Sequence, residues 1–215
     1  MKIAAFNGSP RKNGNTATLL NQALEGAKNA GGECELFHLY SLDYKGCTSC
    51  FQCKKLGGKH YGTCAMKDGL TPILKDIEQY DALLFGTPIY FGAETGEMRS
   101  FLERLIFPYL TYTPNYDSLF PKKIPTAMIY TMNVSEQLMG QLNYGVHLDR
   151  TRMFISNFLG SCEQLISTDT YQFDDYSKYL STGWDAEAKA KRKAEVFPQD
   201  CQKAQELGAR LIESA

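Results

Sequence analysis

The sequence has no long apolar run and almost no net charge. No apolar stretch approaches the roughly 18 residues that would cross a bilayer, so we expect no membrane partner. Lys and Arg number 23 against 24 Asp and Glu, for a net charge of -1. This balance removes the main electrostatic reason to expect a nucleic acid partner. The first residues, MKIAAFNGSP, lack a secretory apolar segment, and we therefore expect a cytoplasmic protein.

Histidine is scarce, whereas cysteine is abundant. The three histidines are not spaced like a metal site. Four of the seven cysteines, however, fall within one short segment: Cys47, Cys50, Cys53 and Cys64. Without a secretion signal a disulfide framework is not expected, so these thiols should be reduced. The cluster is therefore a candidate for metal binding or redox chemistry.

The order of apolar patterns predicts one α/β domain over residues 1–215. Strand-like runs alternate with helical periodicity, which indicates βαβ units and a mainly parallel sheet. The predicted strands are 2–7, 33–39, 81–86, 124–132 and 162–168, and the predicted helices are 16–30, 70–79, 95–107, 135–159 and about 185 onward. Two irregular segments interrupt this alternation: a cysteine loop at 44–68 and an aromatic insertion at 108–122. Loops of this length are often lids or subunit contacts.

The segment after the first strand is rich in groups that bind anions. Residues 8–16, GSPRKNGNT, lie where open parallel sheets bind ligands, at the carboxyl end of a strand. Hydroxyls of Ser9 and Thr16, the Asn15 amide and the Arg11 guanidinium accompany the free N–H groups of a helix start. This concentration favours a phosphate-binding loop over a plain turn. The segment lacks the GxGxxG and GxxxxGK[ST] orders, which disfavours a dinucleotide fold, a kinase or a GTPase.

Three motifs resemble known flavoproteins. Gly8-Ser9-Pro10-Arg11 with Gly14-Asn15-Thr16 resembles the phosphate loop of the flavodoxin-like NAD(P)H-dependent FMN reductase family. The run 87–92, TPIYFG, with the helix after it, resembles the second flavin loop of that family. The spacing Cys47-x-x-Cys50-x-x-Cys53, followed by Cys64 and Asp68, resembles its iron-sulfur flavoprotein branch. Weaker similarity extends through 170–176 and 197–200.

The resemblance implies a fold, a cofactor and a reaction. The fold would be a flavodoxin-like three-layer sandwich with a five-stranded parallel sheet in the order 2-1-3-4-5. The protein would pass electrons from NAD(P)H through bound FMN to a small acceptor such as a flavin or quinone, and no catalytic side chain is needed because the flavin carries the chemistry. It would form a homodimer or homotetramer in which 108–122 covers the neighbour's flavin. The expected FMN-binding residues are Ser9, Arg11, Asn13, Gly14, Asn15, Thr16, Pro88, Ile89, Tyr90, Phe91, Gly92, Thr131 and Asn133.

Several alternatives stay open on the sequence alone. The protein could be an electron carrier that serves a redox partner protein, or a phosphate-binding fold without flavin, with the aromatic residues of 87–92 buried in the core. The resemblance implies a [4Fe–4S] cluster with Cys47, Cys50, Cys53 and Cys64 as ligands. Ten residues between Cys53 and Cys64 depart from the compact pattern of that branch. A loop without metal is therefore favoured over the cluster, and tetrahedral zinc is the third option.

Overall fold

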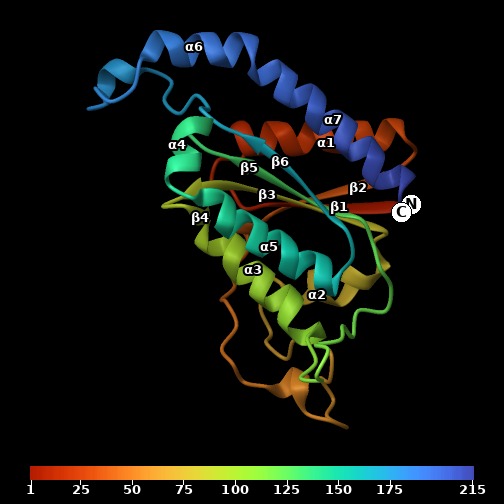
Figure 1. The fold of residues 1–215 in the computed structure, drawn as a ribbon. Helices are drawn as coiled ribbons and strands as arrows, with labels where there is room; N and C mark the ends of the chain where they lie inside the picture. Colours follow the sequence, from red (N-terminus) through yellow and green to blue (C-terminus); the bar gives the residue numbers. More distant parts are fainter.

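The computed structural model describes residues 1–215 as a three-layer α/β sandwich (Figure 1). Five parallel strands form the central sheet, and their spatial order is β2-β1-β3-β5-β6. Their bounds are β1 (Lys2–Asn7), β2 (Glu33–His38), β3 (Ala82–Tyr90), β5 (Thr126–Thr131) and β6 (Cys162–Ser167). A two-residue strand, β4 (Ala93–Glu94), pairs antiparallel with the end of β3. With β4 set aside, this is the predicted order 2-1-3-4-5, which is confirmed.

Helices cover both faces of the sheet (Figure 1). One layer holds α1 (Asn15–Asn29), α6 (Ala186–Glu195) and α7 (Phe197–Glu213), and the other holds α2 (Thr71–Asp76), α3 (Gly96–Ile106) and α5 (Tyr144–Phe158). Side chains of β1 alternate between these layers, as the pleat of a strand requires: Ile3 and Ala5 belong to the core under α1, and Ala4 and Phe6 to the core under α3. The sheet is thus buried on both faces, which explains its nearly continuous apolar strands.

Two predicted boundaries were wrong. Residues 87–92 were expected in a loop after a strand that ends at 86, but β3 continues through Tyr90 because its last residues pair with β4 and β5. The helix expected over 135–159 is divided into α4 (Glu136–Gln141) and α5, and the break falls at Asn143, whose φ is 54°. Asparagine is one of the few residues that adopt this left-handed conformation readily. Gly140 and Gly145 lie inside α4 and α5 and do not interrupt them.

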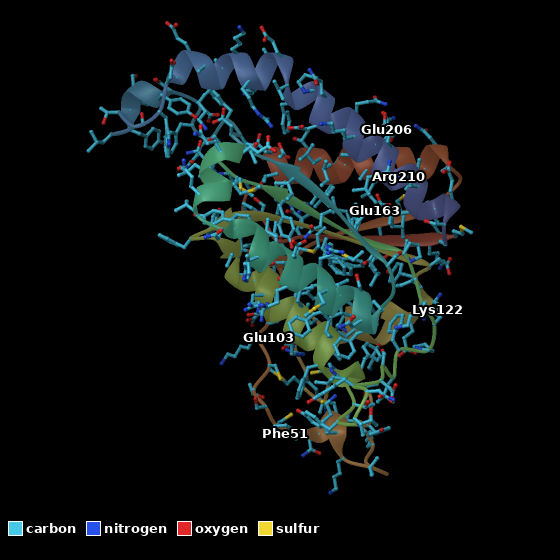
Figure 2. The ribbon with its side chains drawn as sticks, viewed as in Figure 1. Phe51, Glu103, Lys122, Glu163, Glu206 and Arg210 are labelled. Carbon is cyan, nitrogen blue, oxygen red and sulfur yellow. The ribbon has the colours of Figure 1, made fainter.

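The cysteine loop and the aromatic insertion pack together beyond the carboxyl end of α3 (Figure 1, orange and green). The ammonium of Lys54 donates to the carbonyl groups of Phe107, Pro108 and Leu110. Phe51 packs edge-on against Phe107 with 6.0 Å between ring centroids, and Figure 2 shows Phe51 at the foot of the molecule, away from the sheet. The insertion therefore contacts the cysteine loop of its own chain. None of the helices has the length and apolar character that a membrane crossing requires.

Candidate functional site

A cleft of about 1320 Å³ lies at the carboxyl edge of the sheet. The last residues of β3 and the segments that follow β1, β5 and β6 form its sides. Twelve of the thirteen residues predicted to hold FMN line this cleft, all except Gly92. Gly92 instead makes the turn between β3 and β4, with φ at +82°, and packs against Tyr144. The structure thus brings together segments that are far apart in the sequence.

The phosphate loop, residues 8–16, presents unpaired N–H groups to this cleft. Its first half is held by short local bonds, since the Ser9 N–H donates to Asn7 Oδ1 at 2.9 Å and the Arg11 N–H donates to Ser9 Oγ at 3.2 Å. Helix α1 then begins without a side-chain cap and without an acidic residue in its first turn. No protein group accepts from the N–H groups of Asn15 and Thr16. These free donors and the positive end of the helix dipole together favour an anion.

Side chains of the phosphate loop also connect it to the other sides of the cleft. The hydroxyl oxygens of Thr16 and Thr131 are 2.8 Å apart and buried. Arg11 donates from Nη1 to the carbonyl of Gln172 at 2.9 Å, and Asn15 donates from Nδ2 to the carbonyl of Tyr171 at the same distance. Two donors predicted to bind phosphate therefore also hold the segment after β6 against the loop.

The aromatic wall, residues 88–92, points into solvent at the rim of the cleft. Tyr90 is 46% exposed, and Phe91 is fully exposed with φ at 51°. The alternative that these rings belong to the core is therefore excluded. A bulky residue in the left-handed region is strained by roughly 1–2 kcal/mol, and strained, exposed aromatic residues are typical of binding sites.

A buried carboxylate, Glu94, anchors the backbone next to the aromatic wall through hydrogen bonds to Tyr130 and His147. Glu94 follows the turn, its side chain is fully buried, and its Oε2 lies 2.7 Å from Nε2 of His147 on α5. The Tyr130 hydroxyl donates to Glu94 Oε1 at 3.3 Å. Burial, followed by the nearby Glu94 charge, raises the pKa of Tyr130 far above its usual value, so this phenol stays a donor. The three groups hold β4, β5 and α5 in a fixed arrangement beneath the wall.

Asn133, on the third side of the cleft, has an unused acceptor. Its Oδ1 is buried and has no hydrogen-bond partner in the protein. Its backbone carbonyl accepts from the Lys189 ammonium at 2.7 Å. Buried polar atoms are nearly always paired in native proteins, so this oxygen is suited to a ligand N–H.

Sequence reasoning missed the fourth side of the cleft, which we call the hood and define as residues 170–184. It carries several aromatic rings: Phe173 stacks on Tyr179 with 4.0 Å between centroids, and Trp184 lies 6.0 Å from Phe173. Lys193 of α6 places its ammonium 4.6 Å from the centre of the Tyr171 ring. The density of aromatic residues in 171–184 is the signal that could have indicated this surface.

The cysteine loop, residues 44–68, forms a second candidate site. All four clustered cysteines line one small cavity of about 20 Å³, together with residues of α3 and the insertion. Burial raises the pKa of Cys53, which opposes its thiolate unless a cation is bound. No three His, Cys, Asp or Glu side chains are arranged to hold a single metal ion. The cavity has room for about one water molecule, so the loop would have to widen to admit a cluster.

Arg104 of α3 bonds to residues at both ends of this loop. Its side chain is only 1% exposed, and its Nη1 lies 2.7 Å from Asp68 Oδ2. The same guanidinium donates to the Lys45 carbonyl at 2.8 Å and, from Nε, to Cys64 Sγ at 2.9 Å. Burial alone would raise the pKa of Asp68, but hydrogen bonds from Arg104 and the Leu70 N–H hold that pKa below its usual value. One buried cation thus brings Cys64 back to the other three cysteines.

An open parallel sheet with a donor-rich turn and an exposed aromatic wall at the carboxyl ends of its strands is a flavodoxin-like fold whose cleft is suited to an anionic cofactor. The chain belongs to the NADPH-dependent FMN reductase family, whose model matches residues 1–147.

The relatives at higher identity are iron-sulfur flavoproteins. One from Archaeoglobus fulgidus is 38% identical over 104 residues, which are 48% of this chain and 48% of that protein. One from Methanocaldococcus jannaschii is 32% identical over 104 residues, covering 48% of this chain and 51% of that protein. The chain therefore matches only about half the length of these curated relatives.

Solved structures agree with the fold over nearly the full chain. An NAD(P)H:quinone oxidoreductase from Methanothermobacter marburgensis superposes with a TM-score of 0.71 at 13% identity, covering 98% of this chain and 96% of that one. An FMN-dependent NADH-azoreductase from Bacillus anthracis, solved in complex with FMN, has a TM-score of 0.66 at 13% identity and covers 99% of this chain and 100% of that one. At such identities the likeness concerns the fold alone.

Proposed function

We propose that this protein is an FMN-dependent oxidoreductase that takes electrons from NAD(P)H and delivers them to a small acceptor. The observation that carries the proposal is the convergence of the free helix-start donors and the exposed aromatic wall in one cleft. Family membership supports the same cofactor and donor.

The chemistry of the cleft fits FMN. Unpaired N–H groups at the start of α1 and the Arg11 cation suit a dianionic phosphate. The exposed Tyr90 and Phe91 offer an apolar surface for a flat ring system. Asn133 Oδ1, which lacks a partner, suits the N–H on the pyrimidine edge of a flavin. The cleft therefore contains a matching group for each end of the cofactor.

The protein's own part in the reaction is binding and orientation. When bound, FMN accepts hydride and transfers one or two electrons, so no protein acid or base has to perform the chemistry. The phosphate loop anchors one end of the cofactor, and the aromatic wall excludes water from one side of the ring. Glu94, with His147 and Tyr130, keeps that wall in place.

Binding of FMN and riboflavin by an Arg11→Ala variant tests the phosphate assignment. Only FMN carries the dianion, so we expect FMN affinity to fall about tenfold or more, as loss of a charge-assisted hydrogen bond of roughly 1.5–3 kcal/mol requires. Riboflavin affinity should hardly change. Lys12→Ala is the matched control, because this neighbouring cation does not line the cleft. Equal losses for both flavins would refute the assignment.

A second candidate function is electron transfer to a protein through a cluster in the cysteine loop. Four thiols around one cavity supply the donor set of an iron-sulfur cluster, and iron-sulfur flavoproteins are among the relatives. The loop also carries four exposed lysines, Lys45, Lys55, Lys59 and Lys67, which suits an acidic redox partner. Iron content and the visible spectrum of anaerobically purified protein decide between this function and a reductase without a cluster.

We further propose that two copies of the chain associate at the cleft. Phe91 is fully exposed, and Leu138, Leu142 and Val146 on the adjoining α4–α5 corner are each more than 40% exposed. A second copy would cover these apolar groups together with the aromatic wall. Analytical sedimentation of wild type and Val146→Glu tests this proposal. Wild type should sediment as a dimer and the variant should shift toward monomer. A wild type that sediments as a monomer would refute the proposal.

A further inference from the structure

The cleft is larger than one cofactor requires. Pockets for single drug-sized ligands measure roughly 300–1,000 Å³, whereas this cleft measures about 1320 Å³. The groups assigned to FMN lie on three of its sides. The fourth side, formed by the hood and the adjoining face of α6, retains aromatic and cationic side chains that those assignments do not use.

The exposed rings of the hood lie on the same side of the cleft as a cation of α6. Trp184 is 41% exposed and Tyr179 is 54% exposed, and both line the cleft. Lys193 is exposed on α6 and lines the same rim above Tyr171. An aromatic face beside an ammonium is suited to a nucleobase that carries phosphate, because bases stack on aromatic rings and phosphates pair with cations.

We propose that the hood binds the adenosine diphosphate half of the dinucleotide donor, with adenine on Trp184 and a phosphate beside Lys193. This proposal rests on the proposed function. A donor whose nicotinamide reaches a flavin held on the aromatic wall must extend its other half toward the rim of the cleft. The hood is held over the phosphate loop by Arg11 and Asn15, so it forms that rim whether or not a donor is bound.

The carboxylates of this region do not oppose the assignment. Asp169 is paired with the ammonium of Lys189, and Asp185 accepts from the first N–H groups of α6. Asp174 is the one exposed carboxylate of the hood lining without such a partner. It can accept hydrogen bonds from ribose hydroxyls, as acidic residues do in other dinucleotide sites. Lys193 remains the free cation for phosphate.

Truncated donors separate the hood from the rest of the reaction. NADPH and NADH carry the adenosine half, whereas 1-benzyl-1,4-dihydronicotinamide transfers hydride without it. In Trp184→Ala we expect the KM for both dinucleotides to rise about fivefold to tenfold. This rise corresponds to the lower end of the free-energy range for stacking a base on an aromatic ring, because the Trp184 ring is half-exposed. Lys193→Met should raise it roughly threefold and make it less dependent on salt. The KM for the truncated donor should be unchanged.

Two further variants serve as controls. Trp184→Phe should restore most of the loss, and Lys191→Met, a neighbour on α6 outside the cleft, should have no effect. Bound FMN, measured by absorbance, should be equal in all variants. Unchanged KM values for the dinucleotides, or an equal rise with the truncated donor, would overturn the proposal.

A binding assay tests the hood even if the protein oxidises no donor. Trp184 is the single tryptophan of the chain, so its fluorescence reports directly on the hood. ADP-ribose should quench this emission in a saturable way, with weaker binding in Lys193→Met. Quenching without donor oxidation would refute the proposed function and keep the hood assignment. Absence of quenching in wild type would refute the hood assignment itself.

Discussion

Replacing Arg104 by Met should destabilise the protein strongly, because this change leaves a buried carboxylate without its partner. Arg104 is 1% exposed and Asp68 is 16% exposed. Breaking a buried ion pair from one side costs about 3–5 kcal/mol, and the residual exposure of Asp68 places this case near 3 kcal/mol. With a urea m-value of about 3 kcal/mol/M, the unfolding midpoint should fall by about 1 M. Circular dichroism during urea titration measures this shift.

The same helix supplies the control. Arg99 forms an ion pair with Glu103 at 3.8 Å, and both side chains are about half-exposed. Exposed pairs contribute about 0–1 kcal/mol, so Arg99→Met should move the midpoint by a third of that shift or less. The double change Arg104→Met with Asp68→Asn should recover part of the loss, since no buried charge is then left unpaired. Equal losses for Arg99→Met and Arg104→Met would refute the reasoning.

The pair also predicts a dependence on pH. The pKa of Asp68 is lower in the folded state than its ordinary value, so the pair stabilises the fold fully above about pH 4. This contribution is lost as the pH falls from there through the lower folded-state pKa. The difference in stability between wild type and Arg104→Met should therefore shrink in that acidic range and stay constant from pH 5 to 8. A difference that grows as the pH falls would contradict this sign.

Three further predictions concern other parts of the molecule. Tyr90→Ala and Phe91→Ala should change the bound flavin's spectrum but leave the melting temperature nearly unchanged, because both rings are exposed. Gly208→Ala should cost about 1–3 kcal/mol, since its new Cβ would lie 1.7 Å from the Ala23 carbonyl, whereas Gly140→Ala meets nothing within 4 Å and should be neutral or stabilising. If the protein binds iron, single serine replacement of a predicted ligand should abolish iron binding: Cys47, Cys50, Cys53 or Cys64. Serine replacement of the other cysteines should leave the iron content unchanged: Cys34, Cys162 and Cys201. Loss of iron in a variant of this second set would contradict the ligand assignment.

Local patterns in the sequence predicted the sheet and two sides of the cleft, and the residues after the fourth predicted strand, Thr131 and Asn133, were expected on a third side. The period of apolar residues is set within a few neighbours, so it indicated each central strand and helix before the tertiary structure was known. The phosphate loop and the aromatic wall are likewise short continuous segments with a recognisable chemistry. The rule that open parallel sheets bind ligands at the carboxyl ends of their strands then placed them together.

Tertiary structure alone decided what these segments contact. Arg11 and Asn15 bond to carbonyl groups 161 and 156 residues further along the chain, and no local pattern encodes such a partner. Arg104 lies in an ordinary amphipathic helix, and only packing shows that it is the buried anchor of the cysteine loop. The fourth side of the cleft is a further case, because the Tyr171 ring and the Lys193 ammonium meet only in the folded chain. Periodicity is local, whereas the pairing of buried or converging polar groups depends on the path of the whole chain.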